Sequence, residues 1–407
     1  MKLKTLESVD LEGKTILYRA PYDIEVKDLK GALEVKDDIR IKGTLATLRY
    51  LLQKNCKIII LTYVGRPDGK VIEDLRTTPH AKKLALLLNH PVDKVDDCIG
   101  PTVEEKISQM KRGDILMLEN VRFHKGEMED DDNFAIELCK GKDLVVFDGF
   151  PQAMRIHAST TGIERHLPSV AGYYIEHEVR MLGFLLENPV RPFTVIIGGA
   201  KVSDKVDAVN NLLKLADKVL VGGAIANVFL KAQGWELGSS FIEDVFVDSK
   251  RREKKDWVKY AKEILEKYKD KIVVPEDVVV SDGTTVKNID ISKENISEEW
   301  AAFDIGPKTQ ENFSKIIENS KTVFLGGPMG KFEDEKFAVG SIAILNTMTN
   351  LTKNLSGITI VAGGDTIAVA RKYSKLENYS HVSLAGGATL DFLAGKELPA
   401  LTPLIKE

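Results

Sequence analysis

The chain of 407 residues has few cysteines: only Cys56, Cys98 and Cys139. They are scattered, odd in number and without a Cys-x-x-Cys spacing, which argues against a disulfide framework or a structural zinc site. No stretch approaches ~20 uninterrupted apolar residues and the N-terminus lacks an apolar leader segment, so neither a membrane span nor secretion is expected. These absences favour a protein of the reducing cytoplasm.

A large excess of one charge is also lacking. Lys and Arg number 57 and Asp and Glu 61, giving a formal net charge of −4. We therefore expect neither a nucleic-acid nor a membrane partner, and any basic site must be local. The motif Gly-x-Gly-x-x-Gly after a strand, with an acidic residue ~20 positions on, is missing, which disfavours a dinucleotide-dependent dehydrogenase.

Short β-branched runs alternate with helical periods along the whole chain, which predicts an α/β protein with mainly parallel sheets. The length predicts about two domains. First-half strands are predicted at 14–20, 56–62, 114–120 and 143–149, and helices at 41–55 and 80–90. The charged stretch 127–133 predicts a solvated loop, and the charged stretch 250–257 predicts the exposed face of a helix. A helical period over 173–193 predicts a helix between the halves, with a boundary near 190.

The second half contains five strand-like runs that end in paired glycines, within 194–201, 218–225, 322–329, 359–366 and 382–389. The carboxyl ends of parallel strands meet at one edge of a sheet, so we expect these pairs to line a single crevice. Exposed backbone amides there would bind an anion. A tight turn explains any one pair alone, but five pairs together favour a ligand site.

Charged residues follow two of these glycine pairs. Lys201 and Lys205 are expected on one face of a helix that starts near Lys201, where an anion would offset their unfavourable interaction with the helix dipole. Asp365 could hold Mg²⁺ while neighbouring amides face the phosphates of a nucleotide. The alternative is that Asp365 only caps its helix.

Four arginines of the first half stand at predicted strand ends or helix starts: Arg40, Arg66, Arg122 and Arg155, with His157 nearby. Guanidinium groups that converge on one edge repel one another unless an anion or acidic partners neutralise them. Arginine is suited to bidentate contacts with carboxylate and phosphate. Each arginine alone could form a surface salt bridge, but the group favours a small, multiply anionic substrate.

Several long motifs resemble those of the phosphoglycerate kinase family, in family order over nearly the whole chain: LENVRFHKGE, HAST, LPSVAG, ENPVRPFTVIIGGAKVSDK, DIGPKT, GPMGKFEDEKFAVG and AGGDT. The resemblance implies two Rossmann-like three-layer domains, each with a mainly parallel sheet, joined by a hinge helix. The implied parts are a phosphoglycerate-binding domain over 1–172, an interdomain helix over 173–190 and a nucleotide-binding domain over 191–392. Residues 393–407 are expected to pack back on the first domain.

The activity implied is reversible phosphoryl transfer between 1,3-bisphosphoglycerate and ADP, giving 3-phosphoglycerate and ATP, in glycolysis and gluconeogenesis. The family uses Mg²⁺, hinge closure and electrostatic stabilisation, and we expect a cytoplasmic monomer that binds only small molecules. Two alternatives stay open. One is a related kinase acting on a different small phosphorylated acid, and the other is a catalytically weak nucleotide-binding or regulatory homologue.

The resemblance also implies roles for individual residues. It makes Arg40 and Lys201 catalytic and Asp365 the metal ligand. The implied substrate-binding residues are Asp23, Arg40, Arg66, Arg122, Arg155 and His157. The implied nucleotide-binding residues are Gly199, Lys201, Lys205, Gly222, Gly327, Pro328, Glu333, Gly363, Gly364, Asp365 and Thr366.

The chain departs from the family pattern mainly in the substrate-binding half. Pro21 replaces a carboxylate that holds the substrate hydroxyl, and Tyr63 and Met154 replace two histidines. In the second half, Leu384 and Ala385 replace Thr-Gly, Gly326 replaces an asparagine, and Lys331 replaces a small apolar residue near the adenine. The nucleotide-binding half therefore keeps more of the family pattern.

Overall fold

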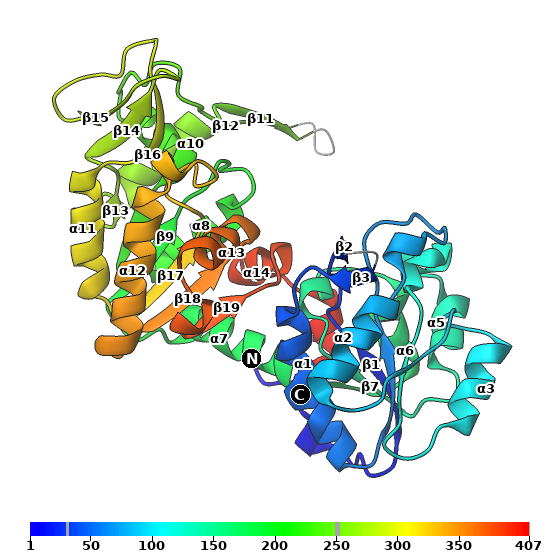
Figure 1. Ribbon diagram of the computed structural model, residues 1–407. Coiled ribbons are helices and arrows are strands. Elements are labelled where there is room, and N and C mark those ends of the chain that lie inside the picture. The colour runs from blue at the N-terminus through cyan, green and yellow to red at the C-terminus, as the bar shows by residue number, and fades with distance from the viewer. Residues whose placement is uncertain (30–31, 249–252, 407) are drawn as a thin grey trace. The chain divides into compact units, whose positions relative to one another are not determined.

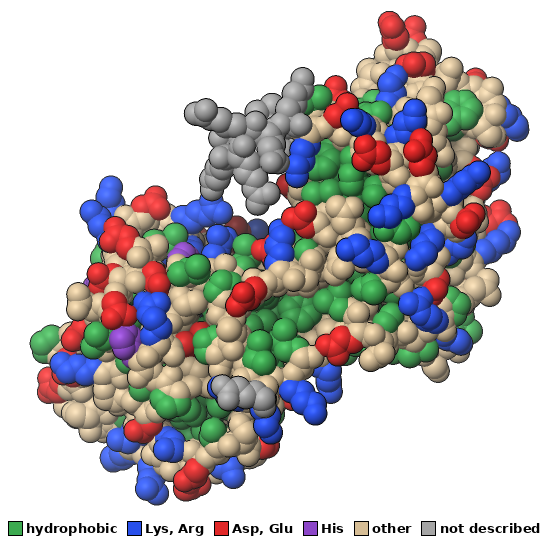
Figure 2. Space-filling model, turned by 180° about the vertical axis from the view of Figure 1, so that it is seen from behind, with side chains coloured by type: hydrophobic (Ala, Val, Ile, Leu, Met, Phe, Trp, Pro, Cys, Tyr) green, Lys and Arg blue, Asp and Glu red, His purple; other side chains and the backbone are tan. Residues whose placement is uncertain are grey.

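The computed structural model describes residues 1–29, 32–248 and 253–406. The chain divides into two compact units, Met1–Arg180 with Glu397–Glu407 (unit 1) and Met181–Lys396 (unit 2). Both are α/β units built around a parallel sheet (Figure 1). Among the described helices, none combines the length and apolar character needed to cross a bilayer. On the face drawn in Figure 2, basic and acidic side chains are interspersed, in keeping with the nearly balanced composition.

The central sheet of unit 1 has six strands in the order β5-β6-β4-β1-β7-β8, all parallel. Their bounds are β1 (Thr15–Arg19), β4 (Lys57–Leu61), β5 (Asp93–Lys94), β6 (Ile115–Met117), β7 (Leu144–Phe147) and β8 (Ser169–Ala171). The four predicted strands are confirmed, each shorter than expected. A separate hairpin joins β2 (Val26–Leu29) and β3 (Ala32–Val35).

Helices cover both faces of this sheet (Figure 1). On one side lie α1 (Ile39–Gln53) and α2 (Thr78–Leu88), whose Leu48 and Leu84 belong to one core cluster with Ile16 and Ile58. On the other side lie α3 (Pro101–Gln109), α5 (Asp132–Cys139) and α6 (Ile163–His166), and a short α4 (Lys125–Met128) precedes α5. Because helices cover both faces of the sheet, neither face meets water. This explains why successive residues of the central strands are all apolar.

The central sheet of unit 2 also has six parallel strands, in the order β13-β10-β9-β17-β18-β19. Their bounds are β9 (Phe193–Ile197), β10 (Lys218–Val221), β13 (Ile272–Val273), β17 (Thr322–Gly326), β18 (Ile358–Ala362) and β19 (His381–Ser383). The five glycine pairs fall at the carboxyl ends of β9, β10, β17, β18 and β19. Their predicted place on one sheet edge is therefore confirmed.

Beyond the connecting α7 (Tyr173–Glu187), the described part of unit 2 contains the α-helices α8 (Val206–Leu215), α9 (Gly223–Ala232), α10 (Trp257–Lys267), α11 (Pro307–Glu318), α12 (Val339–Asn354), α13 (Gly364–Tyr373) and α14 (Gly387–Leu393). Side chains of α11, α12 and α13 share a core cluster with one face of the sheet. Residues of α8, α9 and α10 lie together against the other face.

Two small antiparallel sheets complete unit 2. One consists of β14 (Asp277–Ser281), β15 (Val286–Asp290) and β16 (Ala301–Ile305), with its own apolar cluster. The other pairs β11 (Val245–Asp248) with β12 (Glu253–Asp256). The prediction of a helix over 250–257 is wrong for residues 253–256, which form a strand, and α10 begins only at Trp257. Residues 250–252 lie outside the described part of the chain.

The end of the chain packs within unit 1. The short helix η8 (Pro399–Leu404) follows the return of the chain from unit 2. The Lys4 N–H donates to the Leu404 carbonyl at 2.7 Å and the Ala400 N–H to the Ala153 carbonyl at 3.1 Å. Unit 1 is thus built from both ends of the sequence.

A buried carboxylate connects the sheet of unit 1 to the start of α7. Asp148 is fully buried and accepts hydrogen bonds from the Tyr18 hydroxyl at 2.8 Å, the Thr47 hydroxyl at 2.6 Å and the Ile175 N–H at 3.0 Å. Burial raises the pKa of Asp148 to about 6 despite these donors. A Cβ on Gly172 would lie 2.4 Å from the carboxylate, so only glycine lets the chain pass here.

We expect Asp148→Ala to destabilise unit 1 by about 2–4 kcal/mol, because three buried donors lose their acceptor. Tyr18→Phe is the matched control, since it removes one hydrogen bond and should cost about 1 kcal/mol. Urea unfolding followed by circular dichroism measures both. Equal unfolding midpoints for Asp148→Ala and the unmodified protein would contradict this connecting role.

Candidate active site

Two buried arginines meet an aromatic ring at the carboxyl edge of the unit 1 sheet. Arg19 ends β1, and Arg122 lies in the short helix η3 (Val121–Phe123) after β6. The guanidinium carbon of Arg122 is 3.5 Å from the centroid of the Tyr63 ring, and that of Arg19 is 5.5 Å away. The ring face attracts both cations. Tyr63, which stands where the family has a histidine, therefore brings two positive groups together without adding a third.

A chain of contacts links these groups to other predicted residues. Arg122 donates from Nη1 to the Gly65 carbonyl at 2.7 Å, and the Gly65 N–H donates to Asp23 Oδ1 at 2.9 Å. Arg40 donates from Nη1 to the Asp23 carbonyl at 2.6 Å. Arg66 follows Gly65 directly and is exposed. The structure thus links Asp23, Arg40 and Arg122 through these contacts, with Arg66 next to Gly65 in the chain.

His157 lies in the same neighbourhood but is not a cation. Burial lowers the pKa of His157 to about 4, helped by the charges of Arg122, Arg19 and Arg155. Arg155 therefore also belongs to this electrostatic group. At neutral pH the His157 imidazole is uncharged and offers a polar ring to a ligand.

One member of the charged stretch 127–133 was predicted wrongly. Glu127 is fully buried instead of solvated, and it accepts from the Ser159 N–H at 2.8 Å and the Ser159 hydroxyl at 2.7 Å. Burial raises the pKa of Glu127, and the nearby Arg19 charge opposes that effect. A buried carboxylate beside a buried guanidinium partly neutralises it, which explains why Glu127 leaves the surface.

Each buried arginine keeps an N–H group without a partner among the described residues. Arg19 donates from Nε to the Ser159 carbonyl at 2.9 Å and from Nη1 to the Ala20 carbonyl at 2.6 Å, but Nη2 makes no hydrogen bond. Arg122 Nε is likewise buried and unpaired. Such orphaned charged donors are costly, and a carboxylate or phosphate oxygen would satisfy them. Arg19 was missed from the sequence, although its place at the end of β1 was the available signal.

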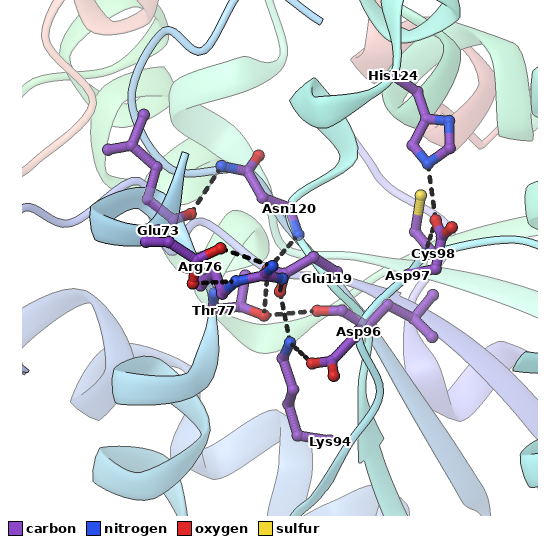
Figure 3. A network of polar contacts seen from close by, with 12 residues as sticks. Glu73, Arg76, Thr77, Lys94, Asp96, Asp97, Cys98, Glu119, Asn120 and His124 are labelled. Atoms are coloured by element: carbon purple, nitrogen blue, oxygen red, sulfur yellow. Dashed lines mark hydrogen bonds and ion pairs between the residues drawn. The ribbon is translucent and has the colours of Figure 1, made fainter. Parts of the chain in front are cut away.

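Figure 3 shows the polar contacts of Glu119 and Asn120, which come shortly before Arg122, and the Arg122 N–H donates to Asn120 Oδ1 at 3.1 Å. Glu119 is 2% exposed and accepts from Arg76 Nη1 at 3.0 Å, from the Thr77 N–H at 2.9 Å and from Lys94. Burial alone would raise the pKa of Glu119, but these donors outweigh it and hold the pKa below its usual value. The Asn120 amide donates to the carbonyls of 64 and 75 at 2.8 and 2.9 Å.

Unit 2 contains a cavity of about 320 Å³ at the carboxyl edge of its sheet. Four predicted nucleotide-binding residues line it: Gly199, Pro328, Glu333 and Asp365. The apolar lining that the sequence did not reveal includes Phe241, Ala302 and Phe303. Lys331 also lines the cavity, with Nζ 5.6 Å from the Phe303 ring centroid. A mostly apolar cavity with a few polar groups in its lining is typical of a nucleoside site.

Several glycines near this cavity allow two segments of the chain to approach each other closely. A Cβ on Gly327 would lie 2.0 Å from the Gly198 carbonyl oxygen, and one on Gly222 would lie 2.4 Å from the Met329 sulfur. Gly222 and Gly327, predicted to bind nucleotide, do not line the cavity themselves. Only the first two pairs contribute a lining glycine, Gly199 and Gly223, and the other three pairs contribute none. The prediction that five pairs line a single crevice was therefore wrong for three of them.

The two lysines after the first glycine pair do not share a helix face as predicted. Helix α8 begins only at Val206, with Lys205 as its N-cap, and Lys201 is exposed in the preceding loop. Glu243 explains the late start, because its carboxylate accepts from the N–H groups of Val202 and Ser203. These contacts hold the loop outside the helix.

Lys205 reaches back toward the cavity. Its Nζ donates to the Gly198 carbonyl at 2.5 Å. Burial lowers the pKa of Lys205 to about 8, while the charges of Asp365 and Asp204 act in the opposite direction. The ammonium group thus lies beside the lining residue Gly199, within electrostatic range of Asp365.

Asp365 is not the cap of its helix. The N-cap of α13 is Gly363, at φ +97°, and no side chain caps the helix. Asp365 occupies the first turn, is exposed and makes no hydrogen bond or ion pair with any described residue. An unpaired carboxylate beside the cavity and near helix N-terminal amides fits a hard divalent cation that also binds phosphate. Gly363, Gly364 and Thr366 surround it at the helix start but do not line the cavity.

Comparisons with known proteins agree with this architecture. The family model described as phosphoglycerate kinase matches residues 6–396. A protein named phosphoglycerate kinase from Chloroherpeton thalassium is 42% identical over 414 residues, covering 99% of each chain.

Two solved structures named phosphoglycerate kinase are also similar. That from Coxiella burnetii has a TM-score of 0.84 at 32% identity and covers 99% of each chain. That from Pyrococcus horikoshii OT3 has a TM-score of 0.83 at 34% identity and covers 99% of this chain and 98% of its own. The chain belongs to the phosphoglycerate kinase family.

Proposed function

We propose that this protein catalyses the reversible transfer of a phosphoryl group between 1,3-bisphosphoglycerate and ADP, giving 3-phosphoglycerate and ATP. The observation that carries the proposal is the pair of buried, unpaired donors, Arg19 Nη2 and Arg122 Nε. A soluble anion that carries both a carboxylate and a phosphate satisfies such donors. Unit 2 supplies the complementary feature, a nucleoside-sized cavity lined by Asp365, with Lys205 bonded to the Gly198 carbonyl next to the lining residue Gly199.

Unit 1 binds the phosphoglycerate in this proposal. Arg19 and Arg122 contact its oxyanions from the sheet edge, and the half-exposed Arg40 with the exposed Arg66 and Arg155 close around it. Pro21 cannot accept a hydrogen bond from the substrate hydroxyl as a carboxylate would. We assign that contact to Asp23 or to the neutral His157, the two members of the proposed set that can accept a hydrogen bond.

Unit 2 binds the nucleotide. Its base lies against Phe303 and its ribose reaches Glu333, while Lys205 and the α13 amides face the phosphates. Asp365 would hold Mg²⁺. When bound, the ion would offset the negative charge of the nucleotide phosphates.

Transfer from an acyl phosphate needs no general base, since the acceptor is already an anion. Catalysis therefore depends on positioning and on stabilising charge on the transferred group. The exposed, unpaired Lys201 and the half-exposed Arg40 supply that charge. Because the two half-sites are on different units, the units must close on each other during the reaction and exclude water. We place the enzyme in the cytoplasm, which its three free, buried cysteines support. That it is a monomer is proposed from the family resemblance alone.

Lys201→Ala is expected to reduce kcat by about 100-fold or more while leaving nucleotide affinity nearly unchanged, because Lys201 contacts the group in transfer. Lys214→Ala removes an exposed lysine of α8 away from the cavity and is the matched control. A coupled assay with 3-phosphoglycerate and Mg-ATP measures kcat. No turnover by the unmodified protein would reject the proposed reaction, and full turnover by Lys201→Ala would reject the role of Lys201.

Asp365→Asn is expected to raise the Mg²⁺ concentration at half-maximal rate by about tenfold or more, since one carboxylate ligand is lost. Glu377→Gln, at an exposed carboxylate beyond the end of α13, should leave that concentration unchanged. The same Mg²⁺ dependence in Asp365→Asn and the unmodified protein would show that Asp365 is not a ligand.

Nucleotide binding should weaken at alkaline pH. The phosphates attract protonated Lys205, whose pKa is lowered to about 8 by burial. We therefore expect kcat/KM for Mg-ADP to fall as pH rises through about 8. Lys205→Gln should give lower values with no break in that range. An identical alkaline break in Lys205→Gln would assign the titration to another group.

A further inference from the structure

Three metal-ligating side chains converge on the far side of the Glu119 network from Arg76 (Figure 3). They are Asp97, Cys98 and His124, and one ligand atom from each lies within 4.8 Å of the other two. The His124 Nε2 and Asp97 Oδ1 atoms are 2.7 Å apart. The group lies outside both half-sites described above, and none of its members is used in the proposed reaction.

Backbone contacts hold the two loops that carry these side chains together. Asp97 and Cys98 follow β5, and His124 follows η3. The Glu119 N–H donates to the Asp97 carbonyl at 3.2 Å, and the Cys98 N–H donates to Asp97 Oδ1 at 2.7 Å. The His124 ring stacks on Phe134 at 5.1 Å between centroids. The convergence is therefore built by the fold and not by chance contact of long side chains.

We infer that Asp97, Cys98 and His124 form a binding site for a divalent transition-metal ion of the zinc type. A mixed oxygen, sulfur and nitrogen donor set suits Zn²⁺ or Co²⁺ and is poor for Mg²⁺ or Ca²⁺, which prefer oxygen alone. Solvent supplies the fourth ligand. The charges balance, because a carboxylate and a thiolate neutralise a divalent cation.

The ligand positions need only small adjustment. Tetrahedral coordination with Zn–N and Zn–O near 2.0 Å and Zn–S near 2.3 Å places ligand atoms about 3.3–3.6 Å apart. Asp97 is 51% exposed and His124 32% exposed, so both side chains have room to move apart, whereas Cys98 is fixed at 0% exposure. The ion replaces the hydrogen bond between Asp97 and His124.

Binding also requires the thiolate of Cys98. Burial raises the pKa of the Cys98 thiol well above its usual value, and the charge of Lys142 opposes that effect. On binding, the S–H bond breaks, its proton leaves to solvent and the metal–sulfur bond forms, with no change of oxidation state. The scattered cysteines argued against structural zinc in the sequence. Their spacing could not reveal this site, because two of its three ligands are not cysteines and His124 comes from a separate loop.

The test is a Co²⁺ titration of the full chain without nucleotide and with excess Mg²⁺ present. We expect one Co²⁺ per chain, a thiolate-to-cobalt charge-transfer band in the near ultraviolet, and loss of that band when Zn²⁺ is added. Leaving out nucleotide makes the result independent of catalysis. Absence of saturable binding, or binding without the charge-transfer band, would overturn the inference and leave an ordinary His–Asp pair beside a buried thiol.

Variants assign the ligands. Cys98→Ser should abolish the charge-transfer band, and His124→Ala should raise the Co²⁺ dissociation constant by at least about tenfold. His124 is on the surface, so that variant stays informative if Cys98→Ser fails to fold. Cys139→Ser, which changes another buried free thiol, should bind Co²⁺ as the unmodified protein does. Unchanged affinity and spectrum in His124→Ala would also overturn the site.

Discussion

The burial of two guanidinium groups at one end of a parallel sheet is the constraint on which the substrate-binding half depends. A charged side chain inside a protein is stable only where nearby groups compensate for lost water. Carbonyl oxygens and Glu127 do this for Arg19, and the Gly65 carbonyl and the Tyr63 ring do it for Arg122. One N–H on each guanidinium stays unpaired. The compensation is incomplete at the point where an anionic substrate would complete it.

The burial of these two arginines also explains how the chain tolerates a departure from the family pattern. Tyr63 contributes a π face that tolerates two adjacent cations, so the loss of a histidine need not weaken the grouping of the arginines. His157 is already uncharged at neutral pH because burial lowers the pKa of its imidazole, with a further contribution from the charges of those same arginines. In the proposed substrate site the positive charge thus resides in arginine alone, and arginine keeps its charge across the physiological pH range.

Much of the fold was predictable because its signals are local. Apolar runs such as Ile58 to Ile60 predicted the central strands, and the glycine pairs predicted the sheet edge at which the cavity of unit 2 lies. Strands were predicted to extend too far where the last residues bond to distant parts of the chain. Glu119 was assigned to a strand, but its N–H donates to the Asp97 carbonyl in a neighbouring loop. The start of α8 was misplaced because Glu243, distant in sequence, holds Val202 and Ser203.

The candidate site was predictable in residue type but not in environment. Arg40, Arg122 and Asp365 stood out by their place after strands or glycines. Glu127 did not, since one buried carboxylate within a run of acidic residues has no sequence signal. The apolar cavity lining was missed for a related reason: Phe241 and Phe303 come from separate segments that only the tertiary fold brings together.

The most direct test of the central claim is calorimetric titration of the nucleotide-free protein with 3-phosphoglycerate. The account predicts saturable binding to one site, weakened by about tenfold or more in Arg122→Met, because a charge-assisted contact is lost. Arg165→Met, which removes an exposed arginine paired with Asp130 and Asp132, should bind normally. Failure of 3-phosphoglycerate to bind, or equal affinity in Arg122→Met and the unmodified protein, would contradict the account.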